Sequence, residues 1–327
     1  MKLFKKLVPL SIVSIFALSF VALPFAAAQS ANERGGSGLQ LSPTRTELSG
    51  QPGEAKTFSV TLKNVTQGDL DVQVFLNDFE SDNESGTPKI IVDETREQTP
   101  YSLKKMITGL QPVNLKANET KQISSVVNIP GDAAPGAYYG AMRFSAVPTG
   151  QTSGDRQVSL TASVAHLIFV EVPGDVTEQI KLEKLVALDE KGKERNIFKK
   201  PGKSALTVKN LGNGFSRPFG KVTVNKGSSQ VHTYDVNNAE TKSIVLPQST
   251  RVFTDDIKNV SKPGKYKLVA GIAYGNGGEV VTYESTFWYL PLWFVAVLVV
   301  LLIALVVGGW ILYKKMARGG TKKSKKA

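Results

Sequence analysis

The sequence predicts an all-β chain, with two tandem immunoglobulin-like β-sandwich domains followed by one transmembrane helix. Three observations predict this fold class. Apolar and polar residues alternate with a period of two through much of residues 39–172 and 176–286, turn residues separate these runs, and an uncharged apolar stretch covers residues 292–312.

Residues 1–28 have the three parts of a secretory signal peptide. Lysines come first, an apolar stretch follows to Phe25, and three alanines form an A-x-A cleavage site before Gln29. An uncleaved first membrane helix is the alternative, and Pro9 and Pro24 argue against it. Residues 29–38 are polar and rich in Gly and Ser, which predicts a flexible leader.

Residues 39–172 are predicted to form the first sandwich. Phe58, Val60 and Leu62 alternate with polar residues, and later segments repeat this period. The other predicted strands are residues 70–76, 89–93, 111–115, 123–129, 137–146 and 157–172. Only residues 101–110 suggest a short helical turn. The short connections predict mostly antiparallel pairing.

Pro173-Gly174-Asp175 interrupts the pattern, and residues 176–286 are predicted to form a second sandwich. Its strands are predicted at residues 180–189, 204–210, 219–225, 230–236, 241–246, 250–255, 266–274 and 279–285. Two motifs recur between the sandwiches. Pro-Gly turns lead into strands that end at Asn64 and Asn210, and Pro-Gly-x-Tyr ends at both Tyr138 and Tyr266. Such turns also occur in unrelated sandwiches, so common ancestry stays open.

Residues 288–313 are predicted to form the transmembrane helix, because the uncharged stretch is long enough to cross about 30 Å of hydrocarbon. Trp and Tyr residues flank both ends, where headgroups lie in a bilayer. A buried core helix would usually be shorter and would lack these flanking aromatics. The tail, residues 314–327, holds seven Lys and Arg residues, which predicts that it is cytoplasmic and that the sandwiches lie outside.

The net charge of +12 is concentrated at the two ends of the chain. Three positive charges fall in the signal peptide and seven in the tail, which leaves a net +2 for residues 29–313. A basic stripe that follows a phosphate backbone is therefore not expected, and we predict no nucleic-acid partner. The lipid bilayer is the partner expected for the helix and the tail.

The side chains give little support for catalysis. The chain has no cysteine, which excludes disulfides, thiolate metal sites and a lipid-anchored signal peptide, and this usage favours a bacterial envelope. Its two histidines, His166 and His232, fall in different predicted domains, and His166 lies in an apolar strand that favours a structural role. The acidic stretch from Asp78 to Glu84 does not fit an EF-hand, and a looser metal site there stays open beside a solvated loop. We predict no enzyme activity, no cofactor and no metal.

The first sandwich resembles the first domain of the WxL-interacting proteins of Gram-positive surfaces. Five segments carry the resemblance in order: residues 41–43, 52–54, 58–64, 115–127 and 140–144. It implies peptidoglycan binding by residues 39–172 and, in the family's second domain, binding of a host or partner. Over residues 176–286 the resemblance is mainly one of layout. Residues 39–45 are also similar to the opening of pilus-assembly chaperones, whose immunoglobulin-like domains use a strand-edge arginine to hold a client's terminal carboxylate, and we interpret this match as a shared sandwich type.

The residues chosen for ligand or partner binding are Tyr138, Tyr139 and Arg143, on the strand that matches the family. Alternation puts Tyr139 and Arg143 on one face of the strand and Tyr138 on the other, and core packing is the alternative role for all three. We therefore predict a non-enzymatic, membrane-anchored cell-surface protein that engages cell-wall peptidoglycan, another surface protein, or both. A membrane-tethered assembly chaperone is the main alternative, and a carbohydrate-active enzyme a weaker one.

Overall fold

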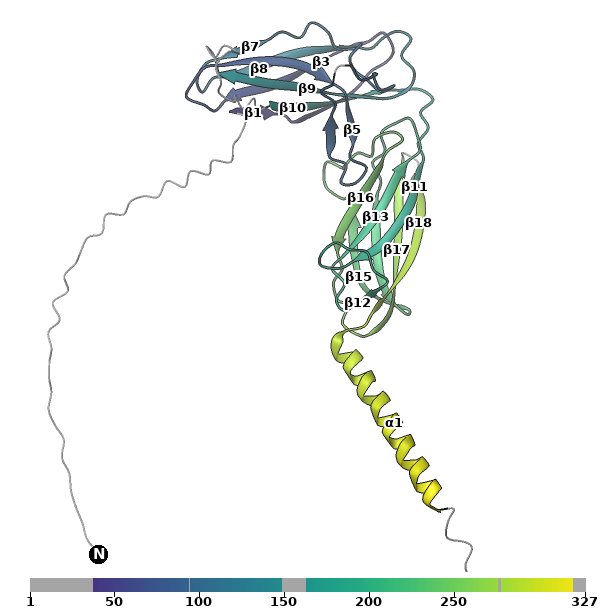
Figure 1. The fold of residues 1–327 in the computed structure, drawn as a ribbon. Helices are drawn as coiled ribbons and strands as arrows, with labels where there is room; N and C mark the ends of the chain where they lie inside the picture. Colours follow the sequence, from purple (N-terminus) through teal and green to yellow (C-terminus); the bar gives the residue numbers. More distant parts are fainter. Residues whose placement is uncertain (1–37, 94, 149–162, 276–277, 320–327) are drawn as a thin grey trace, which may run out of the picture. The chain divides into compact units, whose positions relative to one another are not determined.

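The computed structural model describes residues 38–93, 95–148, 163–275 and 278–319 (Figure 1). The predicted signal peptide, nearly all of the leader and the last eight residues of the tail lie outside the described residues. The described part is mostly strand with one C-terminal helix, which confirms the predicted fold class.

The strands up to Val172 form two facing sheets, which we call the N-terminal sandwich. The three-stranded sheet has the order β1 (Leu39–Ser42), β3 (Ala55–Asn64) and β8 (Thr120–Asn128). The five-stranded sheet has the order β2 (Arg45–Ser49), β10 (Ser163–Val172), β9 (Gly136–Pro148), β4 (Leu70–Asn77) and β7 (Val113–Leu115). A hairpin of β5 (Phe79–Ser81) and β6 (Pro88–Ile90) follows β4. Leu62, Leu115 and Phe144 are fully buried in the shared core.

The strands from Ile180 form a second pair of sheets, the C-terminal sandwich (Figure 1). Its three-stranded sheet has the order β11 (Ile180–Leu188), β13 (Lys203–Asn210) and β16 (Thr250–Asp256). Its five-stranded sheet has the order β12 (Ile197–Phe198), β18 (Glu279–Tyr289), β17 (Gly264–Tyr274), β14 (Phe219–Lys226) and β15 (Ser229–Val236). Leu206, Val222 and Leu268 are buried in its own core. That the two sandwiches are separate domains with boundaries at 39–172 and 176–286 stays a prediction.

The two sandwiches share one strand plan. In each, the first strand pairs with the third, as β1 does with β3 and β11 with β13. The short second strand pairs in parallel with the last strand, as β2 does with β10 and β12 with β18. The other pairings are antiparallel, in line with the prediction.

The two sequence motifs that recur occupy equivalent places in this plan. Asn64 ends β3 and donates its side-chain amide to the carbonyls of Gly68, at 2.7 Å, and Lys116, at 2.9 Å. Asn210 ends β13 and donates to the carbonyls of Gly214 and Val245, at 2.8 and 3.0 Å. Both asparagines are buried.

The second motif also repeats in detail. The hydroxyl of Tyr138 donates to the carbonyl of Ala134 at 3.0 Å, and that of Tyr266 donates to the carbonyl of Lys262 at 2.7 Å, four residues back in each case. The shared turns of the sequence therefore correspond to one structural plan used twice.

The predicted strand at residues 241–246 is wrong. Ile244, Val245 and Leu246 are all buried, so they do not alternate, and their only pairing in the described chain is the bridge between Val245 and Ser216. Residues 101–110 contain a single turn, closed by the amides of Met106 and Ile107 on the carbonyl of Leu103. The short strands β2, β5 and β12 were not predicted, because two to five residues carry too little periodicity.

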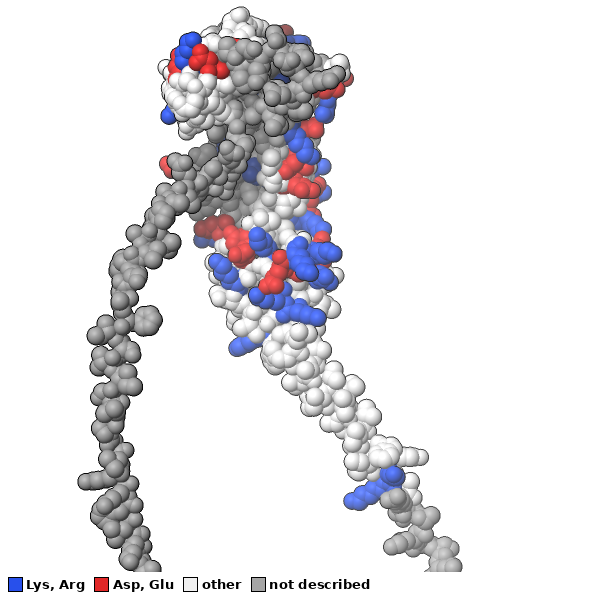
Figure 2. All heavy atoms as spheres, turned by 60° about the vertical axis from the view of Figure 1, so that its left-hand side comes forward, with Lys and Arg blue, Asp and Glu red and all other residues white. Residues whose placement is uncertain are grey.

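The C-terminal helix is α1 (Leu292–Gly319). The predicted start at Trp288 is four residues too early, because Trp288 and Tyr289 pair with β17 as the end of β18. The carbonyl of Pro291 accepts the first helical hydrogen bonds, from Phe294 and Val295. Leu292–Ala317 is long and apolar enough to cross a membrane, and no other helix of the described residues is. Figure 2 shows α1 without charge along most of its length and with basic side chains at its far end.

Candidate functional site

The outward face of the five-stranded sheet in the N-terminal sandwich carries two of the three residues chosen from the sequence. In β9, Met142 and Phe144 point into the core, whereas Tyr139 and Arg143 point outward, as alternation predicts. Their register partners are Phe169 on β10 for Tyr139 and Phe75 on β4 for Arg143.

Tyr138 lies on the opposite side of β9 and packs against the core of the N-terminal sandwich. Its hydroxyl is hydrogen-bonded to the carbonyl of Ala134. Its structural position is therefore that of a packing residue, and a ligand-binding role for it stays a prediction.

Tyr139 is buried in a cluster of aromatic rings. Its ring lies 4.9 Å from that of Phe79, 5.6 Å from that of Tyr101 and 6.2 Å from that of Phe215, measured between centroids. Burial raises the pKa of its hydroxyl well above the ordinary value, with smaller contributions from Tyr101 and the nearby carboxylates. Phe215 belongs to the C-terminal sandwich, so this end of the sheet face is covered.

Arg143 lies on the part of the face farther along β9. Its guanidinium lies 4.5 Å from the centroid of the Phe75 ring, and its Nε donates to Oδ1 of Asn77 at 3.1 Å. Arg143 and Phe75 are half-buried, and Gln73, next along this face of β4, is exposed. The terminal nitrogens of Arg143 make no hydrogen bond to a described residue.

This Phe75–Arg143 pair offers two kinds of contact at once. A guanidinium held over a ring presents N–H groups in a fork that fits a carboxylate. The ring and the guanidinium plane also give an apolar surface of the kind against which a sugar ring can pack. Asn77 fixes the orientation of the guanidinium, so the pair is preorganised.

Three arginines gather where the same sheet face meets the C-terminal sandwich, and sequence reasoning did not find this cluster. Glu47 accepts hydrogen bonds from both Arg45 and Arg217, the latter at 2.5 Å. Arg45 and Arg251 also line a cavity of about 150 Å³ with Phe79, Phe169 and Leu246. Burial, then the charges of Arg217 and Arg251, lower the pKa of Arg45. The three arginines come from segments that are far apart in the sequence, so no local sequence pattern predicts the cluster.

The acidic stretch from Asp78 to Glu84 forms β5 and the start of the turn that joins it to β6. The Asp82 carboxylate accepts hydrogen bonds from the backbone amides of Glu84 and Gly86 and from the Ser85 hydroxyl, which lower its pKa. The hairpin tip is bonded to β16, where the carbonyl of Glu84 accepts from the amide of Val252 at 2.6 Å. Within the described ranges no group of three or more His, Asp or Glu residues could hold a metal.

His166 has a structural position. It is fully buried, its Nδ1 donates to the carbonyl of Pro43 at 2.9 Å, and its ring stacks on Phe58 at 5.7 Å. His232 belongs to the other sandwich, beside Tyr234. Among the described residues, neither histidine therefore has the other one beside it.

A family model described as the WxL Interacting Protein, peptidoglycan binding domain, matches residues 46–146. The matched segment includes Phe75, Asn77 and Arg143. This match confirms the resemblance to the WxL-interacting proteins.

Several solved structures are distantly similar. The E. coli chaperone DraB is 15% identical, over 77% of this chain and 96% of its own, with a TM-score of 0.33. The Salmonella enterica SafA pilin in complex with the SafB chaperone gives 13% identity, 77% and 95% coverage and a TM-score of 0.34. The CsuC-CsuE complex of Acinetobacter baumannii gives 15% identity, coverage of 75% of this chain and 97% of its own, and a TM-score of 0.35. Because the sequence identities and TM-scores are this low, the functions of those proteins do not carry over to this chain. Comparison with curated protein sequences gives no match.

Proposed function

We propose that this chain, whose residues 46–146 match the peptidoglycan-binding domain of WxL-interacting proteins, is a non-catalytic cell-surface protein that binds cell-wall peptidoglycan. The family match is the observation that carries the proposal. It covers most of the N-terminal sandwich, and the C-terminal sandwich and α1 lie outside it.

The Phe75–Arg143 pair is the part of the matched segment with the most suitable chemistry. Peptidoglycan combines sugar rings with peptide stems that end in carboxylates. In the proposed contact the terminal N–H groups of Arg143 donate to a stem carboxylate, and a sugar ring packs beside Phe75. Arg143 is the residue of the three chosen from the sequence that makes this contact, and Tyr139 and Tyr138 pack within the protein on either side of β9.

The proposed location is the outer surface of a cell membrane, with α1 as the single anchor. The uncharged length of α1 and the basic residues after it, Lys314 and Lys315 among them, support a crossing with the tail in the cytoplasm and both sandwiches outside. In that position the N-terminal sandwich could meet the wall and another surface protein could meet either sandwich.

The direct test is sedimentation of residues 29–291, which end just before α1, with purified, protein-free cell-wall sacculi. The fragment should pellet with the sacculi, and digestion of the glycan by a muramidase should return it to the supernatant. A fragment that stays in the supernatant throughout contradicts the proposal. Crosslinking in intact cells separates the alternative, because an assembly chaperone would be recovered with a small exported client protein and not with glycan.

A further inference from the structure

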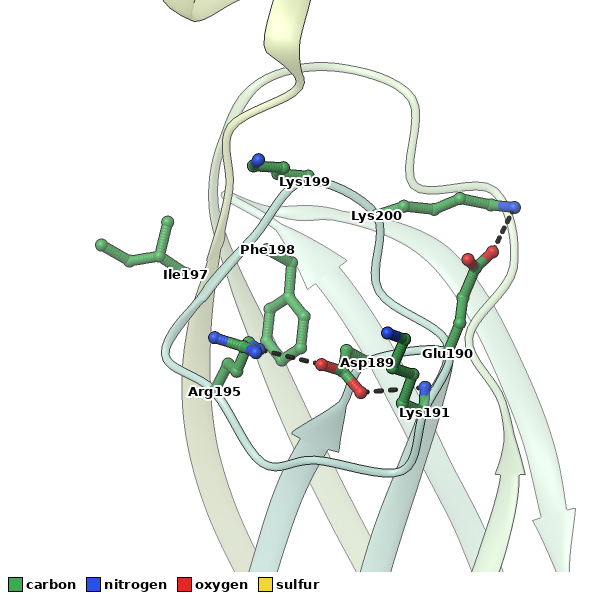
Figure 3. A pocket seen from close by; sticks show the side chains of 8 residues that line it. All are labelled: Asp189, Glu190, Lys191, Arg195, Ile197, Phe198, Lys199 and Lys200. Carbon is green, nitrogen blue, oxygen red and sulfur yellow. Dashed lines mark hydrogen bonds and ion pairs between the residues drawn. The ribbon is translucent and has the colours of Figure 1, made fainter.

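One end of the C-terminal sandwich lies immediately next to the start of α1. β18 ends at Tyr289 and α1 begins at Leu292, so two residues connect them and span at most about 10 Å. The segment before β13 is held at the same place. β12 pairs with the end of β18, and the amide of Leu290 donates to the carbonyl of Phe198 at 2.8 Å. Figure 3 shows this segment beside the first turn of the helix.

Positive charge is concentrated at this end. Residues 176–289 hold 18 Lys and Arg and 11 Asp and Glu, whereas residues 39–172 hold 11 and 15. The loops that join β11 to β13 and β16 to β17 supply an excess of lysines, and Figure 2 shows basic side chains gathered near α1. The lysines of these two loops that form no ion pair, together with Lys265 near the start of β17, define what we call the basic rim: Lys191, Lys193, Lys199, Lys258, Lys262 and Lys265.

The rim lysines are exposed, and none of them forms an ion pair with a described residue. Three acidic residues of the segment between β11 and β13 are already paired: Asp189 with Arg195 at 2.9 Å, Glu190 with Lys200 at 2.6 Å (Figure 3), and Glu194 with Lys184. Asp255 and Asp256, at the end of β16, are exposed and form no ion pair with a described residue. The six rim lysines outnumber these two carboxylates, so the rim keeps an excess of positive charge.

Two large apolar side chains are exposed among these charges. Ile197 is 58% exposed and Trp288 is 46% exposed, and they are register partners in the β12–β18 ladder. Tryptophan prefers the headgroup level of a bilayer, where its ring is in an apolar region and its N–H in a wet one. Basic side chains around an exposed apolar pair are typical of surfaces that lie on anionic membranes.

The chain sequence alone does not place this charge at the membrane. Residues 268–291 contain no Lys or Arg, and the nearest rim residue, Lys265, precedes the first residue of α1 by 27 positions. The residues just before α1, whose charge helps to set the orientation of the helix in the membrane, thus carry no Lys or Arg. The strands bring the rim back to the start of α1 only after folding.

We propose that the basic rim, together with Ile197 and Trp288, binds anionic phospholipid headgroups in the outer leaflet of the membrane that α1 crosses. This rests on the proposed function only in requiring that α1 spans the membrane with the sandwiches outside. The two-residue connection favours lipid over a soluble anion, because Lys199 follows the residue that accepts from Leu290 and Lys265 is the register partner of Trp288, which puts both lysines at the end of the sandwich next to α1. Such binding would hold the C-terminal sandwich on the membrane surface.

The test uses the full chain reconstituted in vesicles. Because the chain has no cysteine, Asn196→Cys gives a single attachment point for a fluorophore beside Ile197, and Asn238→Cys, in an exposed turn after β15, gives a control. Vesicles are made of phosphatidylcholine alone or with phosphatidylglycerol, and both contain a lipid whose headgroup carries a quencher. The label at 196 should be quenched in the anionic vesicles and released by high salt, whereas the label at 238 should not respond.

A charge-reversed pair separates the rim from general charge. Lys199→Glu with Lys262→Glu should lower the ratio of quenched to unquenched label at 196 by about tenfold or more, because each lysine near an anionic surface contributes about a fivefold preference. Lys121→Glu with Lys181→Glu makes the same change in net charge on exposed lysines outside the rim and should leave quenching unchanged.

Three results would overturn the proposal. Equal quenching in neutral and anionic vesicles, or equal effects of the two charge-reversed pairs, would show that the rim does not recognise anionic lipid. Rim-dependent capture of an anionic wall polymer by detergent-solubilised chain, with no response to lipid, would assign the rim to that polymer. Loss of the chain from vesicles in an alkaline carbonate wash would show that α1 does not span, which removes the premise while leaving sacculus binding to its own test.

Discussion

Asn64 and Asn210 close equivalent turns, one in each sandwich, and the backbone groups that the Asn210 side chain satisfies are buried. We expect Asn210→Ala to lower the free energy of unfolding by about 2 kcal/mol, because the freed carbonyls and amide stay buried without partners. Chemical denaturation followed by circular dichroism measures this. Asn238→Ala, at an exposed asparagine, is the control, and an equal effect of both changes would show that the buried hydrogen bonds are unimportant.

His166 should make stability depend on pH. Its burial lowers its pKa below the ordinary 6.5, and the hydrogen bond to Pro43 opposes this only in part. The unfolded chain therefore takes up a proton first as the pH falls below about 6.5, so the free energy of unfolding should decrease from there toward the lowered pKa. His166→Asn keeps a donor for Pro43 but does not titrate. Denaturation of residues 29–291 at pH 7.5, 6.5 and 5.5 should show a shallower decline in the free energy of unfolding for the variant, and parallel curves would contradict this role.

Residue alternation predicted part of the candidate site. It placed Arg143 and Tyr139 on one face of β9 and Tyr138 on the other. Alternation could not identify Phe75 or Asn77 as neighbours of Arg143. Their contact depends on the pairing of β4 with β9, and neither segment's sequence specifies its pairing partner. Alternation also could not show that the C-terminal sandwich covers Tyr139, since Phe215 is far away in sequence.

At the scale of elements, long strands were predicted well and short or covered segments were not. β3 and β17 have one buried face and one more exposed face, which gives a clear period of two. Residues 244–246 are buried on both sides, so their apolar run predicted a strand that does not form. Trp288 was assigned to the helix because it is aromatic and adjoins the apolar stretch, whereas hydrogen bonds to β17 and to Asn196 keep it in β18.

The arginine cluster beside β2 gives an element-scale prediction. Glu47 is the one described carboxylate bonded to both Arg45 and Arg217. Glu47→Gln should lower the free energy of unfolding by about 1 kcal/mol at low salt, because the guanidinium groups then repel one another, and by less in 1 M salt. Glu284→Gln, which breaks the single exposed pair with Lys267, is the control and should have a smaller effect. A loss that does not change with salt would contradict an electrostatic role.

At the scale of the whole molecule, the sequence predicted the all-β class, the repeated turns and the long apolar stretch, because each depends on local composition. The structure added the strand order common to both sandwiches. The structure also shows that strand pairing brings lysines from earlier in the chain close to the start of α1. Features of the second kind depend on which strands pair, and pairing follows from long-range packing.

The central claim is that the Phe75–Arg143 face of the N-terminal sandwich binds peptidoglycan, and a site-specific label tests it most directly. Gln73→Cys puts a fluorophore on that face, and Gln122→Cys puts one on the exposed side of β8 in the other sheet. Soluble glycan fragments with intact peptide stems should change the fluorescence at 73 in a saturable way and leave that at 122 unchanged. Adding Arg143→Gln should weaken the response at 73 by about tenfold, as expected for the loss of a charged hydrogen bond. No response at 73, or the same response at both positions, would contradict the claim.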